Sequence, residues 1–350
     1  MLIMNENEET KAYDLRGMYL PELEEFVISQ GWQKYRAKQI FEWIHKKHVR
    51  TAEEMKNLPM DMRKKLEEYI IGAEEELRLT SKVDGTIKFL FRLYDGQMIE
   101  TVFMRYKHGN SICISSQAGC RMGCDFCASA IGGLVRNLTA SEMLDQIYAA
   151  MYLTGERISN IVVMGTGEAL DNYDNLIRFL NLITDENGYG ISERSITVSS
   201  CGLVPAIRRF ADEERTVTLA LSLHAVTDEK RRRLMPIARS YTIEETLDAC
   251  RYYFEKTGRR ITFEFCLVKG VNDSPEDAKS LAKLVKDINS HVNLIPINPV
   301  AERSYRPGQD KDIYNFKNLL EKNQINVTIR RSMGRDIDAA CGQLRRKYNV

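Results

Sequence analysis

The sequence has no excess of charge of either sign and no long apolar run. Its 350 residues contain 50 Lys and Arg against 49 Asp and Glu, a formal net charge of +1. Such a balance argues against a strongly basic coat for nucleic acid and against an acidic disordered tail. No stretch approaches the length that spans a bilayer, and the first residues, MLIMNENEETKAYDLRG, resemble neither a secretory signal nor an anchor. We therefore expect a cytoplasmic protein without a membrane partner.

The chain also lacks a second pair of closely spaced cysteines to match the group near its middle. It has eight cysteines in all, and in a chain without a secretory signal these are expected to be reduced thiols. We therefore expect them to be ligands, catalysts or small buried hydrophobic residues rather than halves of disulfides. An apolar content of 43% is enough for a sizeable core.

The order of sequence patterns predicts three parts. Apolar residues at helical spacing between Leu20 and Ile71 predict a small helical module over residues 1–75. Two β-rich runs joined by YDGQ predict a β-hairpin connector over 76–110. Residues 111–350 then alternate between strand and helix patterns.

Six strand–helix units in succession predict an α/β fold with a parallel sheet, arranged as a partial (β/α)6 barrel. In such folds the chemistry lies at the carboxyl ends of the strands. Polar motifs fall at those ends here: SSQAGC, GTGEAL, SSCG, SLH and NPV. A last strand, NVTIRRS, and a tail follow.

Three cysteines, Cys120, Cys124 and Cys127, stand in the spacing Cys-x3-Cys-x2-Cys on a loop after a strand. Three thiolates this close can converge on one centre. Structural zinc takes four ligands, commonly as two separated pairs, and no second pair is present. An iron–sulfur cluster with one iron left unligated by protein explains the shortfall better, while zinc and buried inert cysteines are the alternatives.

This spacing, with Phe126 before the last cysteine, resembles that of the radical S-adenosylmethionine (SAM) enzymes. Further motifs, VVMGTGEAL, LSLHA, NLIPINP and GRDIDAACGQLRRK among them, resemble the RlmN/Cfr family of RNA adenine methyltransferases over nearly the whole chain. The resemblance implies a 4Fe-4S cluster on the three cysteines and two SAM molecules per turnover. It also makes the helical start an RNA-binding module.

The resemblance implies three catalytic residues. Cys341 would accept a methyl group from one SAM, and a radical formed from a second SAM would activate that methyl for addition to the adenine carbon. Cys113, seven residues before Cys120 and expected in the same strand, would resolve the resulting protein–RNA adduct by forming a disulfide with Cys341. Glu100 matches the proposed acceptor of the adduct proton. Without the resemblance each cysteine would be taken as a buried thiol, and Glu100 as a solvent-facing strand residue.

Family positions that contact SAM match Gly167, Glu168, Ser199, Ser222, Leu223, His224 and Asn298. Alone, GTGE is more typical of a plain turn and a single His of a satisfied core residue. Three residues depart from the usual RlmN pattern: Ala169 stands in place of proline, Ala238 in place of asparagine, and Thr166 lies in the preceding turn. The GEAL form occurs in Cfr proteins, whereas more of the other motifs resemble RlmN.

The implied substrates are one adenosine in 23S ribosomal RNA and, for the RlmN branch, adenosine 37 of some transfer RNAs, methylated at C2. Basic stretches such as EKRRRLMP, TGRR and residues 301–350, which carry a net +5, could contact phosphates, although such runs are more often solvated faces. External reductants for the cluster and for the disulfide are implied, and we expect a monomer. The alternatives are C8 methylation of the same ribosomal adenosine and a non-enzymatic zinc-binding RNA module.

Overall fold

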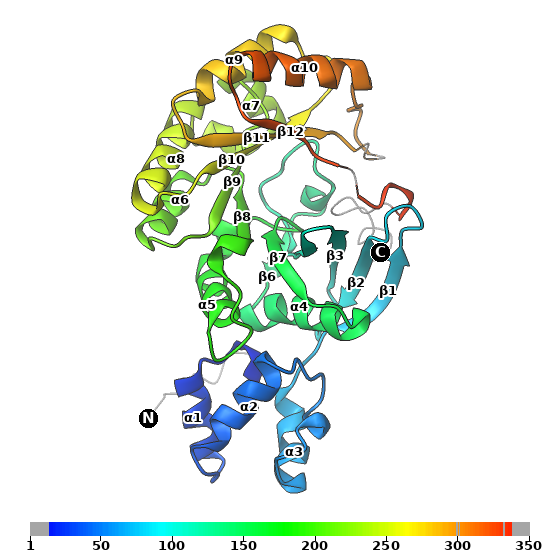
Figure 1. Cartoon of the computed structure of the whole chain (residues 1–350), viewed down its shortest axis with the longest axis vertical. Helices are drawn as coiled ribbons and strands as arrows, with labels where there is room; N and C mark the ends of the chain where they lie inside the picture. The colour runs from blue at the N-terminus through cyan, green and yellow to red at the C-terminus, as the bar shows by residue number, and fades with distance from the viewer. Residues whose placement is uncertain (1–13, 299, 301, 332, 338–350) are drawn as a thin grey trace.

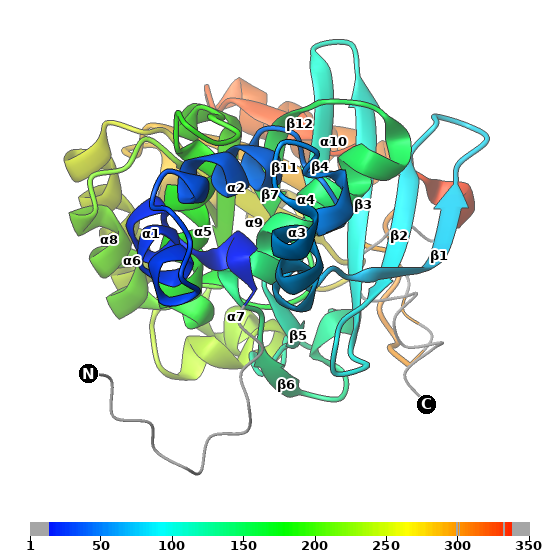
Figure 2. The ribbon, with the colours of Figure 1, turned by 90° about the horizontal axis from the view of Figure 1, so that it is seen from below.

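The computed structural model describes residues 14–298, 300, 302–331 and 333–337. Its helical start comprises η1 (Leu15–Gly17), α1 (Leu20–Ser29), α2 (Arg36–His45), η2 (Ala52–Glu54), α3 (Met60–Leu66) and η3 (Glu67–Tyr69). These elements lie below the sheet-containing part of the molecule, against α4 and α5 (Figures 1 and 2).

One ten-stranded sheet runs through the rest of the chain, in the order β1-β2-β3-β4-β7-β8-β9-β10-β11-β12. Its first four strands pair antiparallel: β1 (Glu74–Thr80), β2 (Ile87–Arg92), β3 (Met98–Tyr106) and β4 (Gly109–Cys113). From β4 onward every pairing is parallel, through β7 (Ile158–Val163), β8 (Ile196–Ser200), β9 (Thr218–Ser222), β10 (Ile261–Leu267), β11 (Ser290–Pro296) and β12 (Val327–Ile329). The expected hairpin at YDGQ is therefore present, and it continues into the main sheet.

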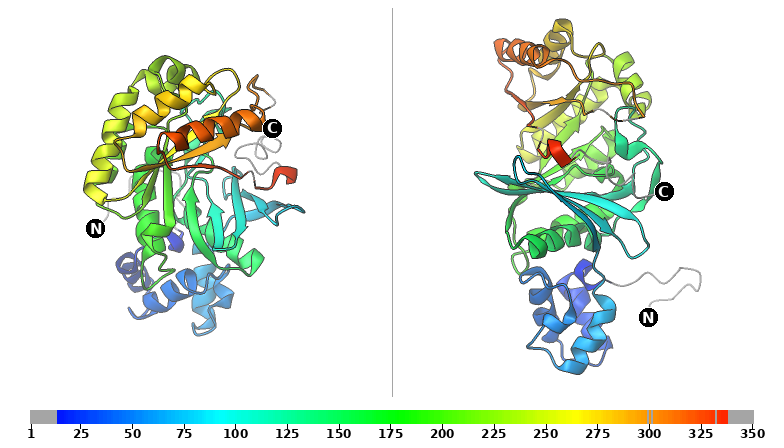
Figure 3. Two further views of the ribbon diagram at one scale, coloured as in Figure 1. Left: turned by 45° about the horizontal axis from the view of Figure 1, so that its top comes forward. Right: turned by 90° about the vertical axis from the view of Figure 1, so that its right-hand side faces the viewer.

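Helices connect the parallel strands and lie along the outer side of the curved sheet (Figures 1 and 3). They are α4 (Ala140–Thr154), α5 (Tyr173–Thr184), α6 (Val204–Asp212), α7 (Asp228–Leu234), α8 (Ile243–Thr257), α9 (Pro275–Val285) and α10 (Asp310–Lys322). With α7 and α8 both following β9, the six strand–helix units of the partial barrel are confirmed.

Helix α4 shows how local sequence sets these boundaries. Thr139 Oγ1 accepts from Glu142 N at 3.2 Å and Glu142 Oε2 accepts from Thr139 N at 2.9 Å, so two exposed backbone donors at the helix start are satisfied. The helix ends at Gly155, whose φ of 71° is the left-handed conformation that glycine adopts without strain. Its apolar residues pack with Ile112 and Ile161 of the sheet in the main core.

Within the part of the chain that the structure describes, no helix combines the length and the apolar character needed to cross a membrane.

A buried carboxylate joins the helical start to the barrel. Asp145, on α4, accepts from Ala73 N at 2.6 Å, from Arg50 Nη1, and from Arg16 Nε at 3.4 Å. The side chains of Asp145 and Arg16 are 2% and 1% exposed. Their charges are therefore compensated by each other rather than by water.

Removing that carboxylate charge should destabilise the protein strongly. We expect Asp145→Asn to lower the free energy of unfolding by about 3 kcal/mol, because Arg50 loses its acidic partner and the buried Arg16 keeps only Asp14. Asp174→Asn on α5 is the control, since Asp174 is 87% exposed in its pair with Arg209; its effect should stay within about 0.5 kcal/mol. Urea unfolding of both variants measures the difference, and equal losses would contradict the role given to Asp145.

Candidate active site at the strand ends

The three-cysteine loop is closed by a short antiparallel pair, β5 (Gln117–Gly119) with β6 (Leu134–Asn137). Cys120 N donates to Gly133 O at 2.9 Å and Cys127 N to Cys124 O at 3.1 Å. Gly119 has a φ of 89°, and a Cβ there would lie 2.1 Å from Gly133 O. Only glycine fits where the two ends of the loop meet.

The three thiols lie within electrostatic reach of one another. Burial, with the charges of Cys127 and Glu168 adding to the effect, raises the pKa of Cys120 to about 12. Burial likewise raises the pKa of Cys124, with Cys127 and Cys120 adding to the shift. Among the described residues, no three His, Cys, Asp or Glu side chains converge closely enough to form a site for one metal ion. The loop nevertheless carries three cysteines within eight positions, and sulfur is the ligand type typical of iron–sulfur centres.

Neighbouring elements hold the middle of this loop. Asp125 N donates to Leu234 O at the end of α7 at 2.9 Å, and its carboxylate accepts from Arg303 Nη1 and Tyr305 Oη, both at 2.7 Å. Phe126 packs edge-on against the His224 ring, with 4.9 Å between ring centroids. The loop is therefore fixed against the carboxyl end of β9.

Gly167 and Glu168 follow β7. Gly167 has a φ of 113°, and a Cβ there would lie 2.7 Å from Ser116 Oγ and 2.8 Å from Gln117 N, so this turn packs directly on the backbone before the cysteine loop. The Glu168 carboxylate is buried and accepts from Cys201 N at 2.8 Å and Leu170 N at 3.3 Å. Burial raises its pKa, while these hydrogen bonds oppose the shift.

Other residues assigned to SAM by the resemblance lie at successive strand ends. Ser199, in β8, donates to Val163 O at 3.1 Å, and Ser222 is the last residue of β9. Leu223 is fully buried and its N donates to Glu264 O at 3.0 Å. Asn298 lies two residues beyond β11 with its side chain exposed.

His224 has an unusual backbone and a fixed ring. Its φ is 55°, rare for a non-glycine residue, and its Nδ1 accepts from Cys266 N at 2.9 Å. Burial lowers the pKa of His224 to about 3, with Arg231 adding to the effect. The ring is therefore neutral at physiological pH and carries its proton on Nε2.

Glu100 is buried in β3, 3% exposed, and its Oε2 lies 3.0 Å from the Nζ atom of the fully buried Lys88 on β2. The expectation that a lone strand glutamate faces solvent is wrong here, because the face it occupies is covered. Sequence reasoning missed Lys88. The available signal was a lysine between the apolar residues Ile87 and Phe89 in the strand IKFLFR.

Cys113 ends β4 and pairs in register with Val102. Since Glu100 precedes Val102 by two residues, Glu100 and Cys113 lie on the same face of the sheet. The placement of Cys113 and Cys120 in one strand is wrong: β4 ends at Cys113, and Cys120 follows the separate strand β5. Cys341 lies outside the described residues.

Arg231 is a second residue that sequence reasoning misplaced. It belongs to the EKRRRLMP run expected to face phosphates or solvent, yet it is 0% exposed. Its guanidinium donates to Cys201 O at 2.8 Å and to Leu223 O at 3.3 Å, so it ties the ends of β8 and β9 together. Gly202 makes room for it, because a Cβ there would lie 2.8 Å from Nη2.

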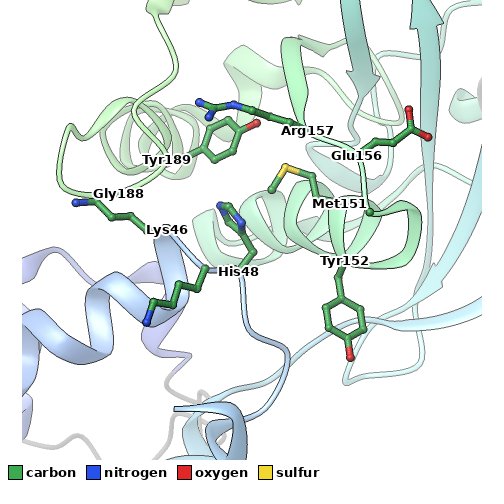
Figure 4. A pocket seen from close by; sticks show the side chains of 10 residues that line it. Lys46, His48, Met151, Tyr152, Glu156, Arg157, Gly188 and Tyr189 are labelled. Carbon is green, nitrogen blue, oxygen red and sulfur yellow. The ribbon is translucent and has the colours of Figure 1, made fainter. Parts of the chain in front are cut away.

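A cavity of about 540 Å³ lies elsewhere, between the end of α2, the end of α4 and the start of β7 (Figure 4). Lys46, His48, Arg157 and Tyr189 are among the residues that line it. Burial, with Arg157, lowers the pKa of His48 to about 4, so the cations here are lysine and arginine. Because this is the amino end of β7, the cavity is separate from the site at the carboxyl ends.

Comparison with known proteins agrees with these features. Residues 114–283 match the family model of the radical SAM superfamily, and residues 13–71 match the N-terminal domain of ribosomal RNA large subunit methyltransferase. The chain is 56% identical over 341 residues to the probable dual-specificity RNA methyltransferase RlmN of Lachnoclostridium phytofermentans, covering 97% of this chain and 96% of that protein. It is 57% identical over 331 residues to the corresponding protein of Clostridium perfringens, covering 94% and 95%.

A solved structure is similar over the same length. The crystal structure of a radical SAM methyltransferase from Sphaerobacter thermophilus superposes with a TM-score of 0.91 at 42% identity, covering 95% of this chain and 98% of that one. Sequence and fold thus agree across both the helical start and the barrel, and the chain belongs to the RlmN family of radical SAM RNA methyltransferases.

Proposed function

We propose that the protein methylates C2 of one adenosine in 23S ribosomal RNA and of adenosine 37 in some transfer RNAs. The observation that carries this proposal is the placement of Glu100 and Cys113 on one buried face of the sheet, beside the strand that leads to the cysteine loop. A thiol and a carboxylate in this arrangement suit the resolution of a covalent adduct, which needs a nucleophile and a proton acceptor.

Radical SAM enzymes carry a 4Fe-4S cluster and SAM, and the donor set here fits both. Cys120, Cys124 and Cys127 would hold the cluster, and Glu168 offers a carboxylate to the SAM ammonium group. Gly167 allows close backbone approach beside it. When bound, these groups supply a one-electron reduction and a carbon-centred radical.

The protein's own residues would then divide the chemistry. The Cys341 thiolate attacks the methyl carbon of one SAM, and the bond from that carbon to the SAM sulfur breaks, so that S-adenosylhomocysteine leaves. The same carbon later bonds to adenine C2. Glu100, held by Lys88, takes the proton from the adduct carbon. Cys113 Sγ attacks Cys341 Sγ, the bond between that sulfur and the transferred carbon breaks, and that carbon takes up a proton to complete the methyl group. The resulting disulfide must be reduced by external thiols.

RNA would contact the helical start and reach the strand ends with its target base unstacked. The cations of the cavity in Figure 4, Lys46, Lys47 and Arg157, support a phosphate contact at the junction of module and barrel. Arg232 and Arg233, both exposed on α7, offer further positive charge near the cysteine loop. We expect a monomer that works in the cytoplasm, where its RNA substrates and reductants are found.

The product isomer tests the proposal directly. Anaerobically purified enzyme, incubated with SAM, a reductant and unmodified ribosomal RNA, should yield C2-methyladenosine by mass spectrometry of the digested RNA. The C8 isomer is the competing outcome. Ala169, which is buried directly after Glu168, gives the motif GEAL, the form found in the Cfr branch. C8-methyladenosine alone would overturn the C2 assignment.

The two catalytic cysteines should give different defects. Cys113→Ala is expected to accumulate a covalent protein–RNA adduct, because no thiol remains to release the methylated base. Cys341→Ala should form neither adduct nor product. Denaturing gels with labelled RNA separate the two results, and Cys250→Ala, in the core of α8, serves as the cysteine control. Methylation by Cys341→Ala would rule out this mechanism.

The space around Gly167 is so narrow that adding one side-chain methyl group there should weaken SAM binding. We expect Gly167→Ala to weaken SAM binding at least about tenfold, equivalent to about 1.4 kcal/mol, because the new Cβ meets Ser116 and Gln117. Gly155→Ala is the control: its φ of 71° is equally left-handed, but nothing lies within 4 Å of the added atom. Equilibrium dialysis with labelled SAM checks this, and equal affinities in the two variants would count against it.

A further inference from the structure

The last described segment, including η8 (Arg335–Ile337), is fastened to a turn about 250 residues earlier in the chain. Asp336 Oδ1 accepts from Ser81 Oγ at 2.7 Å, and Asp336 Oδ2 accepts from Lys82 N at 2.9 Å. Gly334 N donates to Asp84 Oδ2, also at 2.9 Å. Figures 1 and 3 show the segment, in red, beside the turn that joins β1 and β2. We call these three hydrogen bonds the clasp.

The turn that receives the segment is itself well ordered by internal contacts. Ser81 is 3% exposed, and its Oγ accepts from Val83 N and Asp84 N, each at 3.2 Å. Thr86 N donates to Asp84 Oδ1 at 3.0 Å. The hydrogen bonds from Ser81 and Lys82 lower the pKa of Asp336, so it is a carboxylate at neutral pH. The clasp therefore joins a charged acceptor to a turn already fixed in shape.

The same segment contacts the catalytic face of the sheet. Met333 packs against the cluster of Val102, Met104 and Cys113. The turn leads into β2, which carries Lys88 and pairs with β3, the strand that carries Glu100. The turn of the clasp, the proposed proton acceptor Glu100 and Cys113 thus belong to neighbouring strands of one sheet. The chain continues from Met333 through Asp336 toward Cys341.

Chain length makes this fastening relevant to Cys341. Cys341 stands five positions after Asp336, and an extended chain covers at most about 3.5 Å per residue, so Cys341 stays within about 18 Å of the clasp. Outside the clasp, the nearest backbone hydrogen bond to the sheet is that of Arg330 N to Leu294 O at 2.8 Å, 11 positions before Cys341, which gives a reach of about 38 Å. A shorter tether raises the effective concentration of one thiol near another.

We propose that Asp336, Ser81 and Asp84 are positioning residues for Cys341: by fixing residues 334–336 they limit how far Cys341 can lie from the face that carries Cys113 and Glu100. They act through Cys341 and not on the RNA. The proposal rests on the catalytic roles given above to the two cysteines, and it adds that a turn about 250 residues earlier in the chain restricts the reach of one of them.

The disulfide equilibrium tests the clasp independently of methylation. Anaerobic holoenzyme is equilibrated with glutathione buffers of known ratio, and the fraction of Cys113–Cys341 disulfide is measured by peptide mass mapping. We expect Asp336→Asn and Ser81→Ala each to lower the equilibrium constant for disulfide formation about tenfold, because each loses a hydrogen bond to a charged group. A tenfold change corresponds to about 30 mV for a two-electron couple.

Two controls separate positioning from general damage. Asp312→Asn, at an exposed position in the first turn of α10, should leave the equilibrium and the melting temperature unchanged. The double variant Asp336→Asn/Ser81→Ala should be little worse than either single variant, since both remove the same contact. Clasp variants with the equilibrium constant of the unmodified enzyme would overturn the proposal.

The outcomes also distinguish the clasp from the proposed function. If the unmodified enzyme forms no Cys113–Cys341 disulfide, the clasp and the cysteine mechanism fail together. If the disulfide forms and the clasp variants weaken it, the clasp stands whichever methyladenosine isomer the enzyme makes.

Discussion

The antiparallel pairing of β3 with β4 is the constraint on which the site depends. It joins strands carrying Lys88 and Glu100 to the first strand of the parallel sheet, which ends in Cys113. The register Val102 to Cys113 sets which side chains share the face to which we assign the catalysis. A slip of one residue would turn Glu100 and Cys113 to opposite faces, because side chains alternate along a strand. Burial of Val102 and Met104 on one face and Phe103 on the other specifies the register.

Backbone groups, rather than further reactive side chains, fix the residues around the cysteine loop. Glu168 is held by Cys201 N, and His224 by Cys266 N. Arg231 in turn binds the carbonyl of Cys201. Strand ends that are hydrogen-bonded in this way keep polar side chains in place inside an apolar surrounding, where unpaired polar groups would be costly. The fold itself therefore holds Glu168 and His224 in place.

The sequence predicted the repeated units well because their signals are local. Strand and helix periodicity, a capping box such as Thr139 with Glu142, and the cysteine spacing each depend on neighbouring residues. Burial of charged residues depends on tertiary packing. Lys88 and Arg231 belong to residue types that are almost always exposed, so no local pattern predicted their burial. Glu100 was chosen by resemblance alone, and only the register of the folded sheet places it beside Cys113.

The described thiols differ in what their backbone and side chains contact. Burial raises the pKa of Cys250 and of Cys266 to about 12 and that of Cys201 well above its usual value, which disfavours the reactive thiolate form. Cys201 and Cys266 nevertheless serve the site through their backbone, since their amides donate to Glu168 and to His224. The proposed pair of catalytic cysteines needs a different setting, in which one thiol can approach the other. Cys113 ends a strand of the sheet, and the clasp, five positions before Cys341, limits how far that second thiol can lie from it.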